Sequence, residues 1–487
     1  MPNLSVHTRC LQLVTILLTG LVLSMPLHAQ SISLGMRVPI APFMWRDGKS
    51  AADLKLDDRQ RQRWQFIEAN LDHMRAWGGD WNIVIVRQWL DGPDGFARLR
   101  RILDEHAKRG IGVVLRVIED PAVYRRTKDA KPGKYGYDQA YYQWVQALAR
   151  ACSGKVHYFL IGNEADLDQA ASHSGAPGAP RHLVLDYSQY ARVLRTAVLA
   201  IKSVDPGLQV ANSGFSDNSL ALAMARDIYD HQGLVAAQAY WESWKKREGD
   251  SVEGLVGLYR LLKRPETERS VRFVLRALHE PEGSDLFQLH YYRSWRGLQA
   301  MLDWIHREMR DANAVRPVIA AEVGYYVKPT RREDSSGRTR TYINWRHYSE
   351  DDHARDLVKV FATLLGNGIG QALYWNMRDE DDRGATVRLF RATNDPQQFK
   401  PNRVNRAFRM LSHTLTGEHS APAHLPARAG LYEFHFGGGV DVSIVWSEGE
   451  GLAAALDGAR ELRDIEGTVL SRSAIGPSFH GPVYAFW

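Results

Sequence analysis

The chain has 487 residues, of which 44% are hydrophobic and 24% charged, and its formal net charge is +6. That length suits one large decorated domain with a small appendage, and the apolar share is enough to bury a substantial core. The 62 lysines and arginines are dispersed along the chain and no nucleic-acid-binding motif occurs, which excludes a protein built around a basic nucleic-acid-binding stripe.

The first 29 residues have the layout of a secretory signal peptide. Arg9 supplies a positive charge, residues 11–25 form a short apolar run, and residues 26–29 resemble a signal-peptidase site. The run is short for a membrane span, so we expect a periplasmic or secreted protein that makes no membrane contact after cleavage. A retained N-terminal anchor is the alternative. Because only Cys152 would remain, the mature chain cannot form an intrachain disulfide.

Between about residues 32 and 415, short apolar runs alternate with amphipathic stretches of helical spacing. This alternation is typical of βα units that build a parallel sheet. Eight units in about 380 residues fit an α/β fold, the (β/α)8 TIM barrel, provided that only one of two strand-like runs, 235–240 and 286–290, belongs to the barrel. The other predicted strands are 33–38, 81–87, 112–118, 157–162, 208–212, 318–322 and 371–375, and the helices are 58–77, 95–109, 137–151, 187–204, 295–309 and 353–365.

After residue 417 the pattern changes to short strand-like runs separated by glycine-rich turns. We predict a small C-terminal antiparallel β domain over residues 425–487, following a catalytic barrel over 32–415. The domain contains no cluster of catalytic residue types, so we expect it to pack against the barrel, with carbohydrate binding as the alternative. Its predicted strands are 432–436, 440–446, 452–456 and 483–487.

Two predicted strands end in glutamates. Asn163 and Glu164 follow the run 157–162, and Glu322 ends the run 318–322. The C-terminal ends of barrel strands face the active site, where a carboxylate that would be costly in the core can face a ligand. Two carboxyl groups about 5–5.5 Å apart at the mouth could act as the acid and the nucleophile of a retaining glycosidase.

Three strand ends carry distinctive motifs: Ile-Gly-Asn-Glu at 161–164, Ile-Ala-Ala-Glu at 319–322 and Leu-Tyr-Trp at 373–375. These motifs resemble the ends of the fourth, seventh and eighth strands of the clan A glycoside hydrolases. The resemblance implies that Glu164 is the general acid/base, Glu322 the nucleophile, and Asn163 a partner of the sugar 2-hydroxyl. The trailing β domain is similar to that of family 39-like members and relatives in bacterial exopolysaccharide systems. Many members have proline after the acid/base, whereas Ala165 follows here. This departure weakens the assignment to a named family more than the assignment to the clan.

Further substrate-site residues follow from the same resemblance. Arg87 ends the second strand, where clan members often place an arginine that orients the nucleophile, and a salt bridge at the barrel rim is the alternative. His290 and Tyr291 are candidates if 286–290 is the sixth strand, against a purely structural histidine. Trp375 is expected to form the floor of the −1 sugar subsite, against a core tryptophan.

Three loops are candidates for setting specificity. Trp241, within the aromatic segment 240–244, is predicted to stack on a sugar ring, with core packing as the alternative. Residues 172–180 are predicted to act as a lid. The segment after Glu322 is basic, which would attract an acidic polymer, against a simple solvated loop. Its cations are Lys328, Arg331, Arg332, Arg338, Arg340 and Arg346.

The sequence therefore predicts a retaining hydrolase of O-glycosidic bonds in a poly- or oligosaccharide, with no cofactor and no metal. A metal-dependent TIM-barrel hydrolase is one rival, but the 18 histidines are dispersed and no His-Glu-x-x-His motif occurs. A non-catalytic carbohydrate-binding barrel is another, and the presence of both glutamates argues against it. A polysaccharide lyase receives no support from the mid-chain Asn-Glu pattern.

Overall fold

The computed structural model describes residues 30–37, 58–87, 93–167, 186–245, 254–324, 329–333, 339–343, 349–375, 390–391, 400–419, 423–425, 430–439, 441–449, 451–476, 479 and 481–487. The predicted signal peptide and the predicted lid at 172–180 lie outside these residues. Within them, no helix is both long and apolar enough to cross a membrane.

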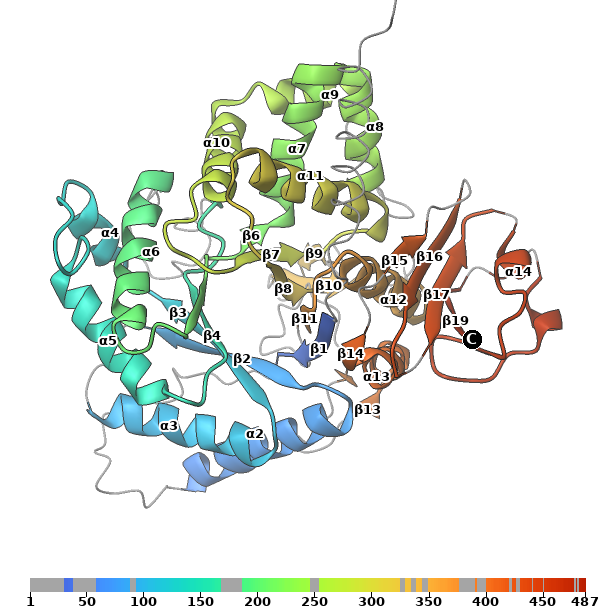
Figure 1. Cartoon of the computed structure of the whole chain (residues 1–487), viewed down its shortest axis with the longest axis horizontal. Helices are drawn as coiled ribbons and strands as arrows, with labels where there is room; N and C mark the ends of the chain where they lie inside the picture. Colours follow the sequence, from blue (N-terminus) through green and yellow to red (C-terminus); the bar gives the residue numbers. More distant parts are fainter. Residues whose placement is uncertain are drawn as a thin grey trace, which may run out of the picture.

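The larger part of the described chain is a parallel (β/α)8 barrel, which confirms the predicted fold class (Figure 1). Two short segments, β5 and β6, together form the fifth barrel strand, and a parallel bridge between Ala211 and Leu286 closes the barrel. The barrel strands are β1 (Gln30–Met36), β2 (Trp81–Arg87), β3 (Gly112–Ile118), β4 (Tyr158–Ile161), β5 (Gln209–Ala211), β6 (Phe215–Ser216), β7 (Phe287–Tyr291), β8 (Val318–Val323) and β11 (Gln371–Tyr374).

Helices surround the barrel, and those between the fifth and sixth strands lie at the top of Figure 1 together with α11. The helices are α2 (Asp58–Ala76), α3 (Pro93–Lys108), α4 (Pro121–Thr127), α5 (Gln139–Cys152), α6 (Tyr187–Lys202), α7 (Asp217–Gln232), α8 (Leu234–Lys245), α9 (Leu255–Leu262), α10 (Pro265–His279), η4 (Trp295–Gly297), α11 (Leu298–Asp311), α12 (Glu350–Gly366) and α13 (Arg403–Leu415).

The sixth barrel strand is the run at 286–290, because the competing run at 235–240 lies in helix α8. That run is rich in alanine, which favours helix. Its buried residues recur at helical spacing, with Ala237, Tyr240, Trp241 and Trp244 on one face.

Side chains of the barrel strands alternate between the helix-facing core and the barrel interior. On β3, Val113, Leu115 and Val117 pack toward the helices, whereas Val114 points into the interior. Arg116 belongs to the same interior row as Val114 and is only 2% exposed. The interior above the apolar layer is therefore where the polar groups of the barrel meet.

A five-stranded antiparallel sheet follows the barrel (right side of Figure 1). The run predicted as a strand at 452–456 is instead the short helix α14 (Leu452–Ala455), as its Leu-Ala-Ala-Ala sequence favours. Trp295 of η4 packs edge-on against Tyr432 and Trp446 of this sheet, with ring centroids 4.6 and 5.2 Å apart. The sheet strands, in order, are β15 (Ala423–Leu425), β16 (Leu431–Phe436), β17 (Val442–Ser447), β19 (Val483–Phe486) and β18 (Glu461–Arg463).

The remaining elements are short. Strand β14 pairs antiparallel with the start of β1, and two hairpins, β9–β10 and β12–β13, follow the seventh and eighth barrel strands. The division into domains at 32–415 and 425–487 remains a prediction. These elements are β9 (Pro329–Glu333), β10 (Thr339–Ile343), β12 (Phe390–Arg391), β13 (Lys400–Pro401), β14 (Gly417–His419) and η6 (Arg472–Ala474).

Candidate active site

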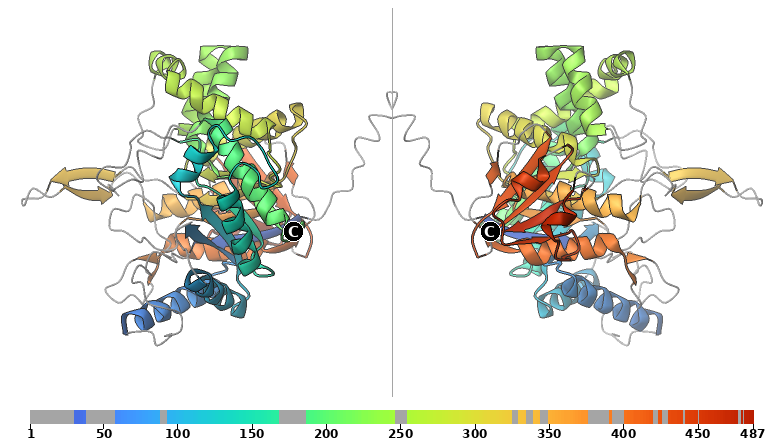
Figure 2. Two further views of the ribbon diagram at one scale, coloured as in Figure 1. Left: turned by 90° about the vertical axis from the view of Figure 1, so that its left-hand side faces the viewer. Right: turned by 90° about the vertical axis from the view of Figure 1, so that its right-hand side faces the viewer.

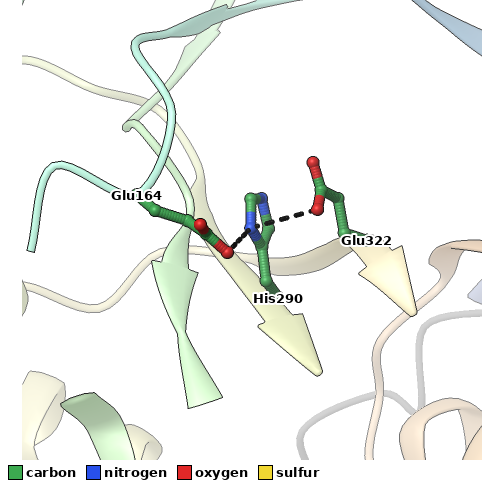
Figure 3. Close-up of side chains that lie close together, drawn as sticks. All are labelled: Glu164, His290 and Glu322. Atoms are coloured by element: carbon green, nitrogen blue, oxygen red, sulfur yellow. Dashed lines mark hydrogen bonds and ion pairs between the residues drawn. The ribbon is translucent and has the colours of Figure 1, made fainter. Parts of the chain in front are cut away.

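Glu164, His290 and Glu322 meet at the C-terminal end of the barrel strands (Figure 3). His290 Nδ1 lies 2.8 Å from Glu164 Oε1 and 3.5 Å from Glu322 Oε2. One carboxylate oxygen from each glutamate and one ring nitrogen of His290 all lie within 4.8 Å of one another. The side chain of Glu164 is 18% exposed and that of Glu322 6%, so the two carboxylates differ in their access to water.

Local backbone features place these side chains. Glu164 has a φ of 44°, in the left-handed region that L-residues seldom adopt, and it follows Gly162 with a φ of 87°. The chain therefore turns sharply after β4. Between β7 and β8 the pairing register shifts after Leu289, so His290 pairs with Glu322. Such an irregularity re-aims a strand side chain, here toward the mouth.

Glu322 accepts hydrogen bonds from two sides. Arg116 Nη1 forms an ion pair with Glu322 Oε1, and Tyr292 Oη donates to Glu322 Oε2 at 2.6 Å. Burial by itself would raise the pKa of Glu322, but His290, Arg116 and Tyr292 together hold this pKa below its usual value. Glu322 is therefore an anion at neutral pH, the state that a nucleophile requires.

The Tyr292 hydroxyl stays protonated beside this anion. Its burial and the neighbouring Glu322 and Glu164 carboxylates raise the pKa of Tyr292 well above the ordinary value. A neutral phenol donates a hydrogen bond, whereas a phenolate would repel Glu322.

The imidazole of His290 has polar contacts at both ring nitrogens. Gln288 Nε2 lies 2.8 Å and Arg116 Nη2 3.4 Å from His290 Nε2. His290 Nδ1 forms a hydrogen bond of 2.8 Å with Glu164 Oε1 and lies 3.5 Å from Glu322 Oε2. The imidazole thus links the two carboxylates.

The ion pair with Glu322 comes from Arg116 of β3, which the sequence analysis had not named. Arg87 ends β2 and is half-buried, and its role at the site stays a prediction. Arg116 Nη1 also donates to Asn163 Oδ1 at 2.6 Å, which places Asn163 beside the pair. The signal for Arg116 in the sequence was a charged residue inside the apolar strand run 112–118.

The candidate Tyr291 points away from the site. It is fully buried in the helix-facing core, and its hydroxyl donates to the Ser294 carbonyl. The next residue, Tyr292, reaches the interior instead, because neighbouring side chains of a strand point to opposite faces. The sequence assignment was therefore displaced by one residue.

The two tryptophan candidates have different surroundings. Trp375 follows β11 and packs on the barrel-interior core, with the guanidinium carbons of Arg37 and Arg116 at 3.8 and 5.2 Å from its ring centroid. Its role as the floor of a sugar subsite stays a prediction. Trp241 is 3% exposed on α8 and packs against Trp244 at 4.8 Å, so the structure favours core packing over sugar stacking.

The basic segment after Glu322 contains the hairpin β9–β10, which extends away from the barrel in Figure 2. The backbones of Arg331, Arg332 and Arg340 belong to this hairpin. Lys328, Arg338 and Arg346 lie outside the described residues.

We predict that Arg116→Gln shifts the acid limb of the pH–rate profile to higher pH. Arg116 helps to depress the pKa of Glu322, so its loss raises that pKa, and a higher pH is then needed to keep Glu322 ionised. We also expect kcat/KM to fall by about 100-fold, as for removal of one well-placed charged group. The measurement is kcat/KM against pH for both proteins, and an acid limb that stays in place or moves to lower pH would contradict the assignment.

No protein-family model and no curated protein matches the sequence. Among solved structures, a family 39 glycoside hydrolase from the gut symbiont Bacteroides cellulosilyticus WH2 is similar with a TM-score of 0.51 and 11% identity, over 94% of this chain and 79% of that one. A glucosidase from Croceicoccus marinus has a TM-score of 0.48 and 13% identity, over 92% and 81% of the two chains. A family 1 β-glucosidase from Thermotoga maritima has a TM-score of 0.46 and 11% identity, over 79% and 97%. The chain thus shares its barrel fold with a family 39 glycoside hydrolase.

Proposed function

We propose that the protein is a retaining glycoside hydrolase that cleaves O-glycosidic bonds in a poly- or oligosaccharide. The observation that carries this proposal is the approach of Glu164 and Glu322 at the barrel mouth, with a carboxylate oxygen of each within 4.8 Å of the other. Retaining enzymes keep their carboxyl groups about 5–5.5 Å apart, whereas inverting enzymes leave about 6.5–9.5 Å for a water molecule. The short separation supports retention.

The surroundings of the two carboxylates support different roles. Glu322 is buried and bonded to Arg116 and Tyr292, which favours the ionised nucleophile. Glu164 is more exposed and its carboxylate is bonded to His290, so it can exchange a proton with water between the two steps.

In the first step, a carboxylate oxygen of Glu322 attacks the anomeric carbon while Glu164 gives its proton to the departing oxygen. The glycosidic bond breaks and a glycosyl ester on Glu322 forms. In the second step, Glu164 removes a proton from water, whose oxygen attacks the anomeric carbon and releases Glu322. We propose that Asn163 and Trp375 contact the sugar in the −1 subsite. The net stereochemistry is retention, since each step inverts.

A metal-dependent hydrolase is the second candidate, because Glu164, His290 and Glu322 could each supply one ligand atom to a cation. The guanidinium of Arg116 argues against it. Arg116 is ion-paired to Glu322 and approaches His290 Nε2 at 3.4 Å, so positive charge already occupies this neighbourhood. Activity that survives exhaustive treatment with EDTA would favour the glycosidase, and loss that is reversed by a divalent cation would favour the metal site.

The proposal is tested with the purified protein on neutral and acidic polysaccharides and on aryl glycosides, with the first-formed anomer identified by NMR. We expect hydrolysis with retention. Inversion would rule out the double-displacement mechanism, and binding without turnover would indicate a non-catalytic carbohydrate-binding barrel.

The basic segment after Glu322 favours an acidic exopolysaccharide as the substrate. If the substrate is acidic, turnover should decrease as the ionic strength rises from low to physiological, because exposed charges are screened.

We further propose that the protein is exported to the periplasm or secreted, with cleavage after Ala29. Strand β1 begins at Gln30 and pairs there with His419, so this cleavage would leave the first barrel strand complete. We predict that the mature protein from cells begins at Gln30. N-terminal sequencing of the protein from a periplasmic or culture fraction checks this, and an uncleaved chain in the membrane fraction would support an anchor instead.

A further inference from the structure

The fifth barrel strand is interrupted beside the active site. β5 ends at Ala211 and β6 begins at Phe215, so residues 212–214 leave the strand ladder although Asn212 and Ser213 are buried. Buried backbone groups outside a ladder need other partners. Asn212 Oδ1 accepts the backbone N–H of Gln288 at 2.9 Å, which replaces a ladder bond to β7.

Ser213 binds two consecutive peptide groups of the neighbouring turn. The Ser213 carbonyl accepts the N–H of Glu164 at 3.1 Å, and Ser213 Oγ accepts the N–H of Ala165 at 3.3 Å. Between these two bonds lies the residue with the φ of 44°. A glutamate keeps a left-handed backbone conformation only where the surrounding structure holds it there. Ser213 supplies the hydrogen bonds to the N–H groups of Glu164 and of the residue that follows it.

Ser213 is in turn attached to the end of β4. Tyr190 Oη accepts the Ser213 N–H at 2.6 Å and donates to the carbonyl of Ile161 at 3.2 Å. Tyr190 is fully buried on α6. A closed path of hydrogen bonds and chain therefore runs from Ile161 through Tyr190 and Ser213 to Glu164.

The next residue of the interruption lies against the histidine of the site. Gly214 has a φ of 76°, and a Cβ at this position would lie 2.3 Å from His290 Nε2. His290 forms a hydrogen bond with the carboxylate of Glu164. The interruption thus borders Glu164 at its backbone and, through His290, at its carboxylate.

We infer that Ser213 is a positioning residue for the general acid/base: it holds the peptide N–H groups on both sides of the Glu164 α-carbon and so aims the carboxyl group at the departing oxygen. This inference rests on the proposed function. Ser213 has no exposed surface and acts on the substrate only through Glu164.

The test compares two aryl glycosides of a sugar that the wild-type protein hydrolyses, one with a dinitrophenolate leaving group and one with a poor leaving group. Only the poor leaving group needs the proton of Glu164. For Ser213→Ala we expect kcat/KM to fall about 100-fold on the poor leaving group, as a small misplacement of a reacting group can cause, and to stay within about threefold on dinitrophenolate.

Two further variants complete the experiment. Ser412→Ala removes the hydroxyl of another buried serine, which donates to the carbonyl of Gly78, and it should leave the ratio between the two substrates unchanged. Tyr190→Phe keeps the ring but removes the hydroxyl that holds Ser213, and it should change the ratio in the same direction as Ser213→Ala. Tyr190→Phe also tests the inference if Ser213→Ala does not fold.

The outcomes separate the inference from the function beneath it. Equal losses on both substrates, or no loss on either, in Ser213→Ala and Tyr190→Phe would overturn the positioning role and leave the glycosidase intact. A wild-type protein that hydrolyses no glycoside and takes no label from a 2-fluoro glycoside would overturn the proposed function, and the role of Ser213 with it.

Discussion

Glu322→Gln should lower kcat by about 10⁴-fold or more, because the amide cannot form the glycosyl ester. The variant also loses the ion pair with Arg116. The amide keeps the shape of the side chain and an oxygen that accepts from Tyr292, so we expect the fold to remain. Kinetics with an aryl glycoside measure the loss, and circular dichroism checks the fold. A 2-fluoro glycoside should label wild-type protein on Glu322, as identified by mass spectrometry of the peptides, and should not label the variant.

A matched control is Glu119→Gln. Glu119 directly follows barrel strand β3, is buried, and accepts a hydrogen bond from Tyr124. Burial raises the pKa of Glu119 to about 7, so an amide there replaces a carboxyl group that is partly neutral at pH 7. We expect this variant to keep its activity.

A label on Glu164 in the wild-type protein would show that the two catalytic roles are reversed.

Glu164→Ala should separate substrates by their leaving groups. Loss of the acid should lower kcat/KM by about 10²–10⁴-fold where the leaving group needs a proton, and spare dinitrophenyl glycosides, whose first step needs none. Their second step should become slow, because no base activates water, so the glycosyl ester should accumulate. Azide, which needs no base, should then restore turnover and yield a glycosyl azide of retained configuration.

Glu164→Gln is the companion variant, because it keeps the length of the side chain and an oxygen that can accept from His290 Nδ1. It should show the same dependence on the leaving group with weaker rescue by azide, since the side chain still fills the space that azide needs. The acid/base assignment would fail if both variants lost activity equally on every substrate and azide restored none of it.

Most barrel strands could be predicted from the sequence because their signal is local. The runs at 81–87 and 112–118 have the same bounds in the structure, since buried parallel strands are continuous apolar segments. The sixth strand could not be chosen in this way. The runs at 235–240 and 286–290 are both short and apolar, and periodicity alone does not separate a buried strand from a helix of that length.

Some of the site residues could also be predicted from a local signal in the sequence, and others could not. Glu164 and Glu322 were identifiable because a carboxylate that ends an apolar strand belongs at the barrel mouth. Tyr291 was chosen where the structure uses Tyr292, because a shift of one residue moves a side chain to the other face of a strand. Trp241 was a candidate by composition, and its burial on α8 depends on helices that the segment itself does not specify.

The sequence by itself determined the barrel, the order of its strands and the two glutamates at its mouth, because each depends on hydrophobic pattern and on where a strand ends. Only the tertiary structure decided which groups surround those glutamates. Arg116, Tyr292 and Ser213 come from three different strand regions, and their contacts with Glu322 and Glu164 join residues 206, 30 and 49 positions apart. Such contacts depend on strand register and on a local interruption of a strand, which are set by packing across the whole barrel rather than by neighbours in the chain.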